Sequence, residues 1–541
     1  MEEAMFTTRR LDHLGIVTGL CQEIDLIAQI DAQVGPTDRK VSVGQAVQAM
    51  VLNALGFVGR PLYLTPEFFS NKPVDLLIGG GLTPQDFNDD SLGRALDKLY
   101  DAGLTEGFAK VACHALEVFG IAHQFVHLDS SSFSLKGEYA TSSEDPQAVT
   151  ITHGYSKDHR PDLKQVVVSM ICSYRSSIPV WLEALDGNRV DKKSFPSTIK
   201  AYIEQLSGED LPYFIVDSAL YSKDNLQTLS ATRWISRVPG TIKAVQQLYQ
   251  AISPQQMESA SQEGYLYMEV GNWYGGVKQR WLVVFSQAAY KREQATFQKQ
   301  LEKEHAQAEA ALRKLSSKEF DDNESAQASV DALVQSWSFH TVDAHFLEVP
   351  HYARPGRPKQ GGKPKRVGFR VGGQIVEQRD AIEQALATKG KFVLATNELE
   401  EEQLPTETIL TAYKGQGASV ERGFRFLKDP LFFASSLFLE KPERIMALLM
   451  VMGLSLLIYA LGEHKLRTQL AARKQTLPNQ VGQPTQRPTL RRIFQVFEGI
   501  DLLLIHHPAT TQGQVLNLKP IHRRILELLG PQVQKYYIPD G

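Results

Sequence analysis

The feature that most constrains this chain is a run of 17 uncharged residues at 445–461, with the sequence IMALLMVMGLSLLIYAL. A run of this length is at the short edge of a membrane span, and it also suits a helix buried at the centre of a large domain. Charged residues stand close to both ends, and no other segment of the chain is comparable. We therefore expect a buried central helix and no association with a membrane.

The length of the chain requires more than one hydrophobic core. It has 541 residues, 43% of them hydrophobic, whereas one core rarely serves more than about 300 residues. Its three cysteines, Cys21, Cys113 and Cys172, are far apart and in no metal-ligand spacing, which argues against disulfides and zinc. The first residues lack the apolar core of a signal peptide. We expect three or four domains and a cytoplasmic location.

Charge is distributed unevenly along a nearly neutral chain. The net charge of -3 argues against a surface covered in Lys and Arg, but residues 351–370 and 464–493 each hold seven Lys or Arg and no acid. Such local basic tracts indicate two contacts with phosphate groups. Within the first tract, Arg354, Arg357 and Lys359 alternate with Gly and Pro, and Gly-Arg-Pro is the core of an AT-hook. A flexible strap on DNA and an idle loop are both open readings.

Local periodicity divides the chain into helical and β-type parts. Residues 1–115 show helical spacing, with Ser42 as an expected cap and Gly56 as an expected stop. Such short helices fit a DNA-binding helix-turn-helix module and fit any small helical bundle equally. From about residue 120, apolar runs of strand length alternate with turns, and one helical stretch interrupts them. The fold class expected from this texture is mixed α/β.

Two aspartates stand beside apolar runs of strand length. Asp129 follows FVHL, and Asp217 follows YFIV. Acidic residues at strand ends can converge on one edge of a sheet and hold cations there. Asp129 and Asp217 are therefore candidate metal ligands, although either position can also be structural. His127, two residues before Asp129 and on the same strand face, is expected to be a packed histidine.

A third carboxylate lies on an amphipathic stretch, ASVERGFRFLKDP. Apolar residues at helical spacing predict a helix that ends at the proline. Glu421 and Lys428 are seven positions apart, which is about two turns, so they share one face. A carboxylate and a lysine so placed can serve a metal ion and a neighbouring phosphate along one groove. An exposed helix with scattered charges is the alternative.

Several motifs of this chain resemble those of a known family. HLDSSSFSLKGEY, HGYSKDHRPDLKQ, YFIVDSALYSKDNL, FVLATNEL and AYKGQGASVERGFRFLKDP occur in the order found in DDE transposases of bacterial insertion sequences. Within that family the chain resembles the subgroup with a tyrosine, arginine, glutamate, lysine signature. The resemblance implies a ribonuclease-H-like catalytic core, interrupted by an insertion between the second and third acids. It also implies a dimer that acts on paired transposon ends.

The resemblance assigns roles to residues. Asp129, Asp217 and Glu421 match the three metal-binding and catalytic acids, while Lys428 and Tyr413 match the signature lysine and tyrosine. Where the subgroup has arginine, this chain has glutamine, and the spacing from the tyrosine to the glutamate is one residue longer. Glutamine can hydrogen-bond a phosphate but brings no charge. The expected DNA contacts are Tyr413, Gln416, Arg422, Arg425, Lys157, Arg160, Lys164, Arg354, Arg357 and Lys359.

The chemistry implied by three carboxylates is metal-assisted phosphodiester cleavage and strand transfer. Two Mg²⁺ ions can activate an oxygen nucleophile and stabilise the leaving oxygen, and hard carboxylate oxygens suit Mg²⁺. Mn²⁺ is expected to substitute. The expected partners are double-stranded DNA, as terminal inverted repeats and target, and a second copy of the chain in a homodimer. The expected location is then the nucleoid.

The expected organisation has five parts. These are a helical DNA-binding module at 1–115, a catalytic core at 116–240 and 391–470, a mixed β and helical insertion at 241–390, and a helical C-terminal region at 471–541. The function expected from them is cut-and-paste DNA transposition. Two other classes stay open, namely a transposase-derived repressor without catalysis and a metal-dependent nuclease without strand transfer.

Overall fold

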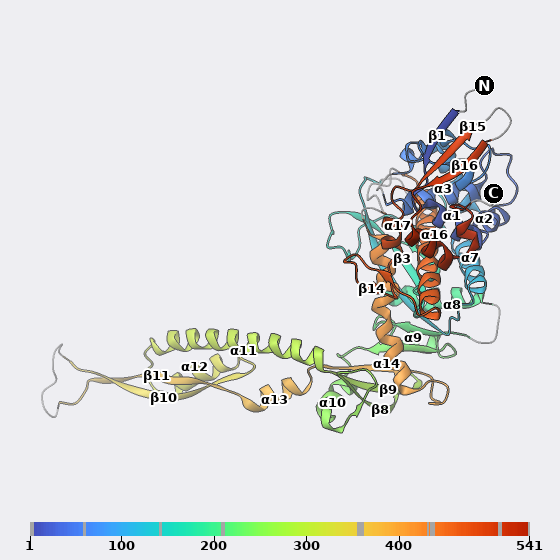
Figure 1. The fold of residues 1–541 in the computed structure, drawn as a ribbon. Coiled ribbons are helices and arrows are strands. Elements are labelled where there is room, and N and C mark those ends of the chain that lie inside the picture. The colour runs from blue at the N-terminus through green and yellow to red at the C-terminus, as the bar shows by residue number, and fades with distance from the viewer. Residues whose placement is uncertain are drawn as a thin grey trace.

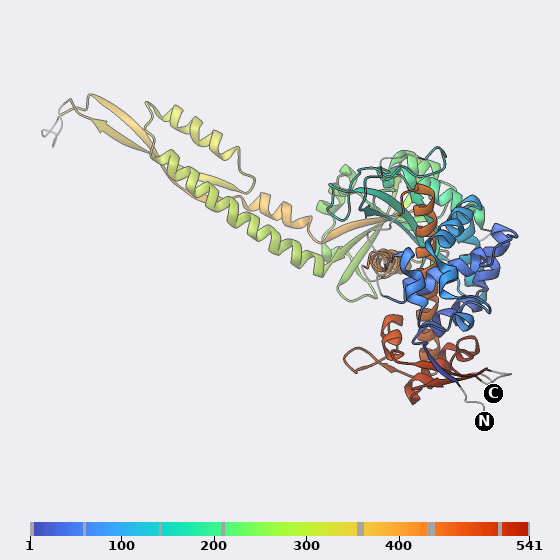
Figure 2. The same cartoon turned by 90° about the horizontal axis from the view of Figure 1, so that it is seen from above.

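The computed structural model describes the chain except for residues 1–4, 58–60, 140–142, 207–210, 354–361, 430–431, 433–438, 507–510 and 539–541. The candidate DNA contacts Arg354, Arg357 and Lys359 therefore lie outside the described residues. The described part consists of a large body and a long arm that projects from it (Figure 1, Figure 2). Both termini lie at the end of the body that is remote from the arm.

The body is built on a nine-stranded sheet with the order β4-β3-β2-β5-β6-β12-β9-β8-β7. β2 pairs antiparallel with β3, which pairs antiparallel with β4. β5 and β6 run parallel to β2, and the strands beyond β6 are antiparallel again. The strands are β2 Phe125–Leu135, β3 Lys164–Ser173, β4 Pro179–Leu185, β5 Tyr213–Val216, β6 Trp234–Val238, β7 Glu258–Ser259, β8 Tyr265–Tyr274, β9 Val277–Ser286 and β12 Lys391–Thr396.

Helices surround this sheet and form the N-terminal part. Ser42 and Gln45 form the capping box of α3, so the expected helix start is confirmed. The helices of the body are α1 Leu14–Glu23, α2 Leu26–Val34, α3 Val43–Leu55, α4 Thr65–Phe69, α5 Val74–Leu77, α6 Asp89–Asp101, α7 Leu104–Val118, α8 Asp191–Gln205, α9 Lys223–Thr228, α10 Lys243–Ala251, α14 Thr406–Lys414, α15 Val420–Leu427, α16 Pro442–Ala472, α17 Leu490–Val496, α18 Pro520–Leu529 and α19 Pro531–Gln534.

The uncharged run forms the centre of the long helix α16. Among the described residues α16 alone is long and apolar enough to cross a membrane, and 89% of its most apolar window is buried inside the protein. It packs against β4, the N-terminal helices α1, α3, α6 and α7, and the C-terminal helix α18. One hydrophobic core therefore joins the N-terminal helices, one face of the sheet and the C-terminal helices.

The arm has its own small core. It comprises α11 Gln287–Ser316, α12 Asn323–Val334, the two-stranded ribbon of β10 His340–His351 and β11 Arg366–Glu377, and α13 Arg379–Ala387. Leu312, Val330 and Val371 are buried between the two long helices and the ribbon. This cluster is separate from the core of the body, which agrees with the projecting arm in Figure 1.

Two expectations from the sequence need correction. β8 and β9, which the sequence placed in the insertion, extend the main sheet, because β9 pairs with β12 along its length. The terminal parts are also not purely helical, since β1 Met5–Arg10 pairs with β15 Asp501–His506, which pairs with β16 Thr511–Leu516. The run DLLLIH is too short to separate strand from buried helix by periodicity, and its partner is about 500 residues away. A small pair, β13 Leu477–Pro478 and β14 Pro484–Thr485, also lies in the C-terminal part.

Replacing Glu463 in α16 is expected to destabilise the body. Its side chain is almost fully buried, pairs with Arg422 and Arg467, and accepts a hydrogen bond from the Leu490 backbone N–H at 3.0 Å. Removing one partner of a buried ion pair leaves the other charges uncompensated, at a cost of about 3–5 kcal/mol. Glu463→Ala should therefore lower the chemical denaturation midpoint clearly. Glu309→Ala, at an exposed pair, is the control, and equal effects of both variants would contradict this role.

Candidate functional site

The two aspartates meet where β2 and β5 run side by side. In the parallel pairing of these strands, Leu128 lies opposite Val216. The next residues are Asp129, in the middle of β2, and Asp217, directly after the last residue of β5. Because paired residues of neighbouring strands face the same side of a sheet, this register places both carboxylates together at the end of β5.

Both carboxylates lie in a partly desolvated place. Burial, with smaller contributions from the nearby carboxylates of Asp217 and Asp191, raises the pKa of Asp129 to about 6 against the opposing charge of Lys157. Burial also raises the pKa of Asp217, again with a contribution from Asp191. The backbone N–H groups of Ser130 and Ala219 donate to Asp129 and Asp217, each at 2.8 Å. The cluster therefore concentrates negative charge that favours a cation.

A lysine reaches this cluster from the turn HGYSKD. The ammonium group of Lys157 lies 3.7 Å from an oxygen of Asp129 and 3.2 Å from an oxygen of Asp191. Lys157 also donates to the backbone oxygen of Ser130 at 2.7 Å. Burial alone would lower the pKa of Lys157, but Asp129 and Asp191 raise it above its usual value. Lys157, expected from sequence as a DNA contact, is thus an ion-pair partner of the first aspartate.

The third acid lies on the neighbouring helix α15. Glu421 is in the first turn of this helix and is exposed. Burial raises the pKa of Tyr413, and the charges of Asp217 and Glu421 raise it further while Arg237 opposes the shift. Tyr413 therefore lies within electrostatic range of the second and third acids.

The carboxylates are chemically suited to a hard divalent cation. In the described part of the chain, however, the three acids are not close enough together to form a complete metal site. Carboxylate oxygens are preferred ligands of such ions. Among the residues that the structure describes, no three His, Cys, Asp or Glu side chains form a group able to hold a metal ion. The structure thus brings Asp129 and Asp217 together and leaves Glu421 on the adjacent helix.

The other basic candidates separate into two places. Lys428 pairs with Asp158 at 2.7 Å and lies over the ring of Phe133, so it joins the end of α15 to the turn that carries Lys157. Arg160 is exposed and pairs with Asp162, two residues away. Lys164 donates to the backbone oxygens of Glu138 and Tyr139 at 2.7 and 2.9 Å.

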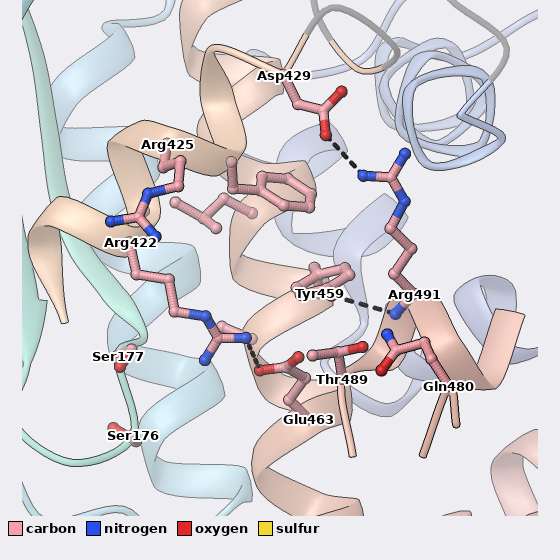
Figure 3. Close-up of a pocket in the computed structure, with 14 residues that line it drawn as sticks. Ser176, Ser177, Arg422, Arg425, Asp429, Tyr459, Glu463, Gln480, Thr489 and Arg491 are labelled. Carbon is pink, nitrogen blue, oxygen red and sulfur yellow. Dashed lines mark hydrogen bonds and ion pairs between the residues drawn. The ribbon is translucent and has the colours of Figure 1, made fainter. Parts of the chain in front are cut away.

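Arg422 and Arg425 line a cavity of about 370 Å³ between α15, α16 and α17. Figure 3 shows Arg422 directed toward Glu463, and Arg491 toward Asp429, across this cavity. The aromatic rings of Phe426 and Tyr459 form part of the lining. The cavity therefore has arginines and aromatic rings in its lining, and Glu421 is not among the lining residues.

Two further candidates are buried. Gln416 is only 9% exposed, in a short 3-10 turn before α15, so this structure does not present it to a ligand. His127 is fully buried, and its Nε2 lies 2.9 Å from the backbone oxygen of Ala412 in α14. Burial lowers the pKa of His127 to about 4, so it is a neutral packed side chain, as the sequence predicted.

Sequence reasoning missed two charged residues of this site. Asp191 begins α8 and Arg237 lies on β6, more than 60 and 100 positions from Asp129. Asp191 reaches the site because α8 packs against β2, and Arg237 acts on the site through Tyr413. No local spacing in the sequence indicates either position. In the sequence, Asp191 looks like an ordinary acidic residue in the first turn of a helix, and this position gives no indication of a role at a site.

Comparison with known proteins identifies the family. Residues 122–458 match the family described as a transposase DDE domain. The chain belongs to the DDE transposase family. Residues 6–113 match a domain of unknown function (DUF4277). No curated protein matches the chain.

One solved structure resembles this transposase over most of its length. It is a cryo-EM structure of the piggyBac transposase synaptic complex with hairpin DNA, 10% identical, with a TM-score of 0.37. The match covers 92% of this chain and 82% of that one. The family assignment by itself makes the chain a DNA transposase, an enzyme that uses divalent metal ions and acts on DNA.

The metal-free protein is expected to gain stability from Asp129→Asn at pH 8. The pKa of Asp129 is raised from 3.8 to about 6, and its side chain is 21% exposed, so its charged form opposes folding by up to about 3 kcal/mol. As pH falls below 6, Asp129 of the wild type becomes protonated in the folded state, and the free-energy cost of its buried charge disappears. The gain should therefore be largest at pH 8 and vanish near pH 4.

Denaturant unfolding with a chelator present measures this difference. The control is Asp162→Asn, because Asp162 is exposed and removal of its charge relieves no desolvation cost. A gain that does not depend on pH between 4 and 8 would show that the charge of Asp129 is not its source.

Proposed function

We propose that the chain is the transposase of a bacterial insertion sequence, which cuts the transposon ends and joins them to target DNA by a cut-and-paste reaction. The observation that carries this proposal is the adjacent placement of Asp129 and Asp217 by the pairing of β2 with β5. The signature positions Tyr413 and Lys428 flank Glu421 in the sequence. The influence of Asp217 and Glu421 on the pKa of Tyr413, and the pairing of Lys428 with Asp158 in the turn of Lys157, support the subgroup with this signature.

The strand order supports a ribonuclease-H-like core. In the order β4-β3-β2-β5-β6, three antiparallel strands precede two that run parallel to β2. The first acid lies on the central strand, and the second follows the adjacent parallel strand. In the proposed division of the chain, the catalytic core resumes after the arm with β12, α14 and α15, and α15 carries the third acid.

Asp129, Asp217 and Glu421 would hold two Mg²⁺ ions, for which Mn²⁺ can substitute. The ions, when bound, supply an activated oxygen nucleophile and stabilise the leaving oxygen of the phosphodiester. The chain's own groups orient the DNA. Tyr413 is within electrostatic range of Asp217 and Glu421, and Lys428, which pairs with Asp158 in the turn of Lys157, would offer a point charge to a terminal phosphate.

DNA is proposed to lie along the basic residues around this site. Arg160 and Lys164 lie between the first and second acids in the sequence, and Arg422 and Arg425 on α15 follow the third. The basic tracts at 351–370 and 464–493 add contacts farther away. We propose a homodimer in the nucleoid of the cytoplasm, because two ends must be joined in one event, and an N-terminal module that contributes to end recognition.

Alanine at any of the three acids should abolish cleavage and preserve binding. In Asp129→Ala, Asp217→Ala and Glu421→Ala, cleavage of a duplex carrying the element's own ends with Mg²⁺ should fall by at least about a thousandfold, because each removes a ligand of the reactive metal centre. Gel-shift binding to the same duplex should remain, and Asp162→Ala is the matched control. Cutting that persists in one variant would assign a structural role to that residue.

The products distinguish transposition from simple hydrolysis. The wild-type protein with Mg²⁺, cut ends and a target plasmid should give a covalently joined product, visible by gel electrophoresis. Release of cut DNA without any joined product would instead make the chain a nuclease, and binding without any cutting would make it a DNA-binding repressor.

A further inference from the structure

The ammonium group of Lys157 lies beside the carboxylate charge that a metal ion at the proposed centre would neutralise. It lies among three oxygen atoms from two segments, namely Asp129 at 3.7 Å and the backbone oxygen of Ser130 at 2.7 Å on β2, and Asp191 at 3.2 Å on α8. The Lys157 side chain is about one third exposed. Because most of its aliphatic chain is buried and its ammonium group has three oxygen neighbours, Lys157 is positioned by the fold and differs from a freely moving surface lysine.

The lysine is also held through its backbone. The Lys157 N–H donates to the hydroxyl of Ser132 at 2.9 Å, which ties the turn to β2. Asp191 is held separately, because the hydroxyl of Ser130 donates to its other carboxylate oxygen. Lys157 therefore lies between two fixed carboxylates, of which one belongs to the proposed metal centre and the other does not.

We propose that Lys157 is an exchangeable counter-cation of the metal centre and that Asp191 is the positioning residue that retains it. Before a divalent ion binds, Lys157 compensates the charge of Asp129 and Asp217. When the ion binds, the ammonium leaves Asp129 and stays on Asp191 and the Ser130 carbonyl, at the edge of the centre. This inference rests on the proposed metal role of Asp129 and Asp217.

The reason for such an arrangement is electrostatic. Two partly desolvated aspartates repel each other, and a resident monovalent cation reduces that repulsion without satisfying the ligand demand of a divalent ion. A divalent ion at Asp129 in turn repels the ammonium, whose next acceptor, Asp191, is already in contact. Asp191 acts through Lys157, and a role as a direct metal ligand is the competing explanation of its position.

Metal affinity of the DNA-free, full-length protein tests the exchange. Free Mn²⁺ is measured by electron paramagnetic resonance during titration of the wild type, Lys157→Met and Lys164→Met. Lys157→Met keeps the stem but removes the competing charge, so it should bind Mn²⁺ about tenfold more tightly than the wild type. Lys164→Met is the matched control, because Lys164 contacts backbone oxygens and neither aspartate.

A double-variant cycle separates the two roles of Asp191. If Asp191 retains the lysine, Asp191→Asn should weaken Mn²⁺ binding clearly in the wild-type background and much less in the Lys157→Met background. If Asp191 is a direct ligand, the loss should be the same in both backgrounds, and this outcome would overturn the assignment of Asp191 as a positioning residue.

The wild type provides a measurement that no folding defect can obscure. Acetylation of Lys157 by an amine reagent, followed by mass spectrometry, should change as Mn²⁺ is added, while acetylation of Lys164 should not. Equal Mn²⁺ affinity of Lys157→Met and Lys164→Met, or no change in Lys157 reactivity, overturns the exchange. Absence of any Mn²⁺ binding by the wild type would instead contradict the proposed metal centre itself.

Discussion

A helix that is apolar on every side has to be surrounded, and α16 imposes this requirement on the whole body. Helices from the first 118 residues, strand β4 and the C-terminal helix α18 all pack on it. Glu463 is the one charged residue among the buried residues of α16, and its carboxylate joins α15, through Arg422, to the start of α17. The helix that carries the third acid is therefore positioned by the same element that organises the core.

The proposed active centre follows the opposite principle, because its polar groups are placed where solvent is scarce. Burial is the largest influence on the pKa of both Asp129 and Asp217, ahead of repulsion from neighbouring carboxylates. Lys157 offsets part of that cost. The result is a pair of carboxylates whose environment favours a positive charge before any substrate arrives, which is the condition for a preorganised site.

Much of this arrangement could be predicted from local sequence. The apolar runs around Asp129 and Asp217 are long enough for strands, and the spacing around Glu421 favours a helix, so each acid was placed on the correct element. The sequence could not predict the pairing of β9 with β12 or the place of Asp191, because both depend on contacts between distant segments. For the same reason, the sequence could not decide whether the leucine-rich run DLLLIH forms a strand or a buried helix, because pairing with a distant strand determines its conformation.

The meeting of the two chain ends has a consequence for the order in which the protein can fold during synthesis. The Tyr537 hydroxyl donates to the Asp12 carbonyl oxygen at 2.7 Å, α19 packs on α1, and β15 pairs with β1. Helix α1 is synthesised before these segments, and its packing surface is completed only when residues about 500 positions later have been made. The arm closes its core within residues 312–375 and can fold as soon as these residues are made.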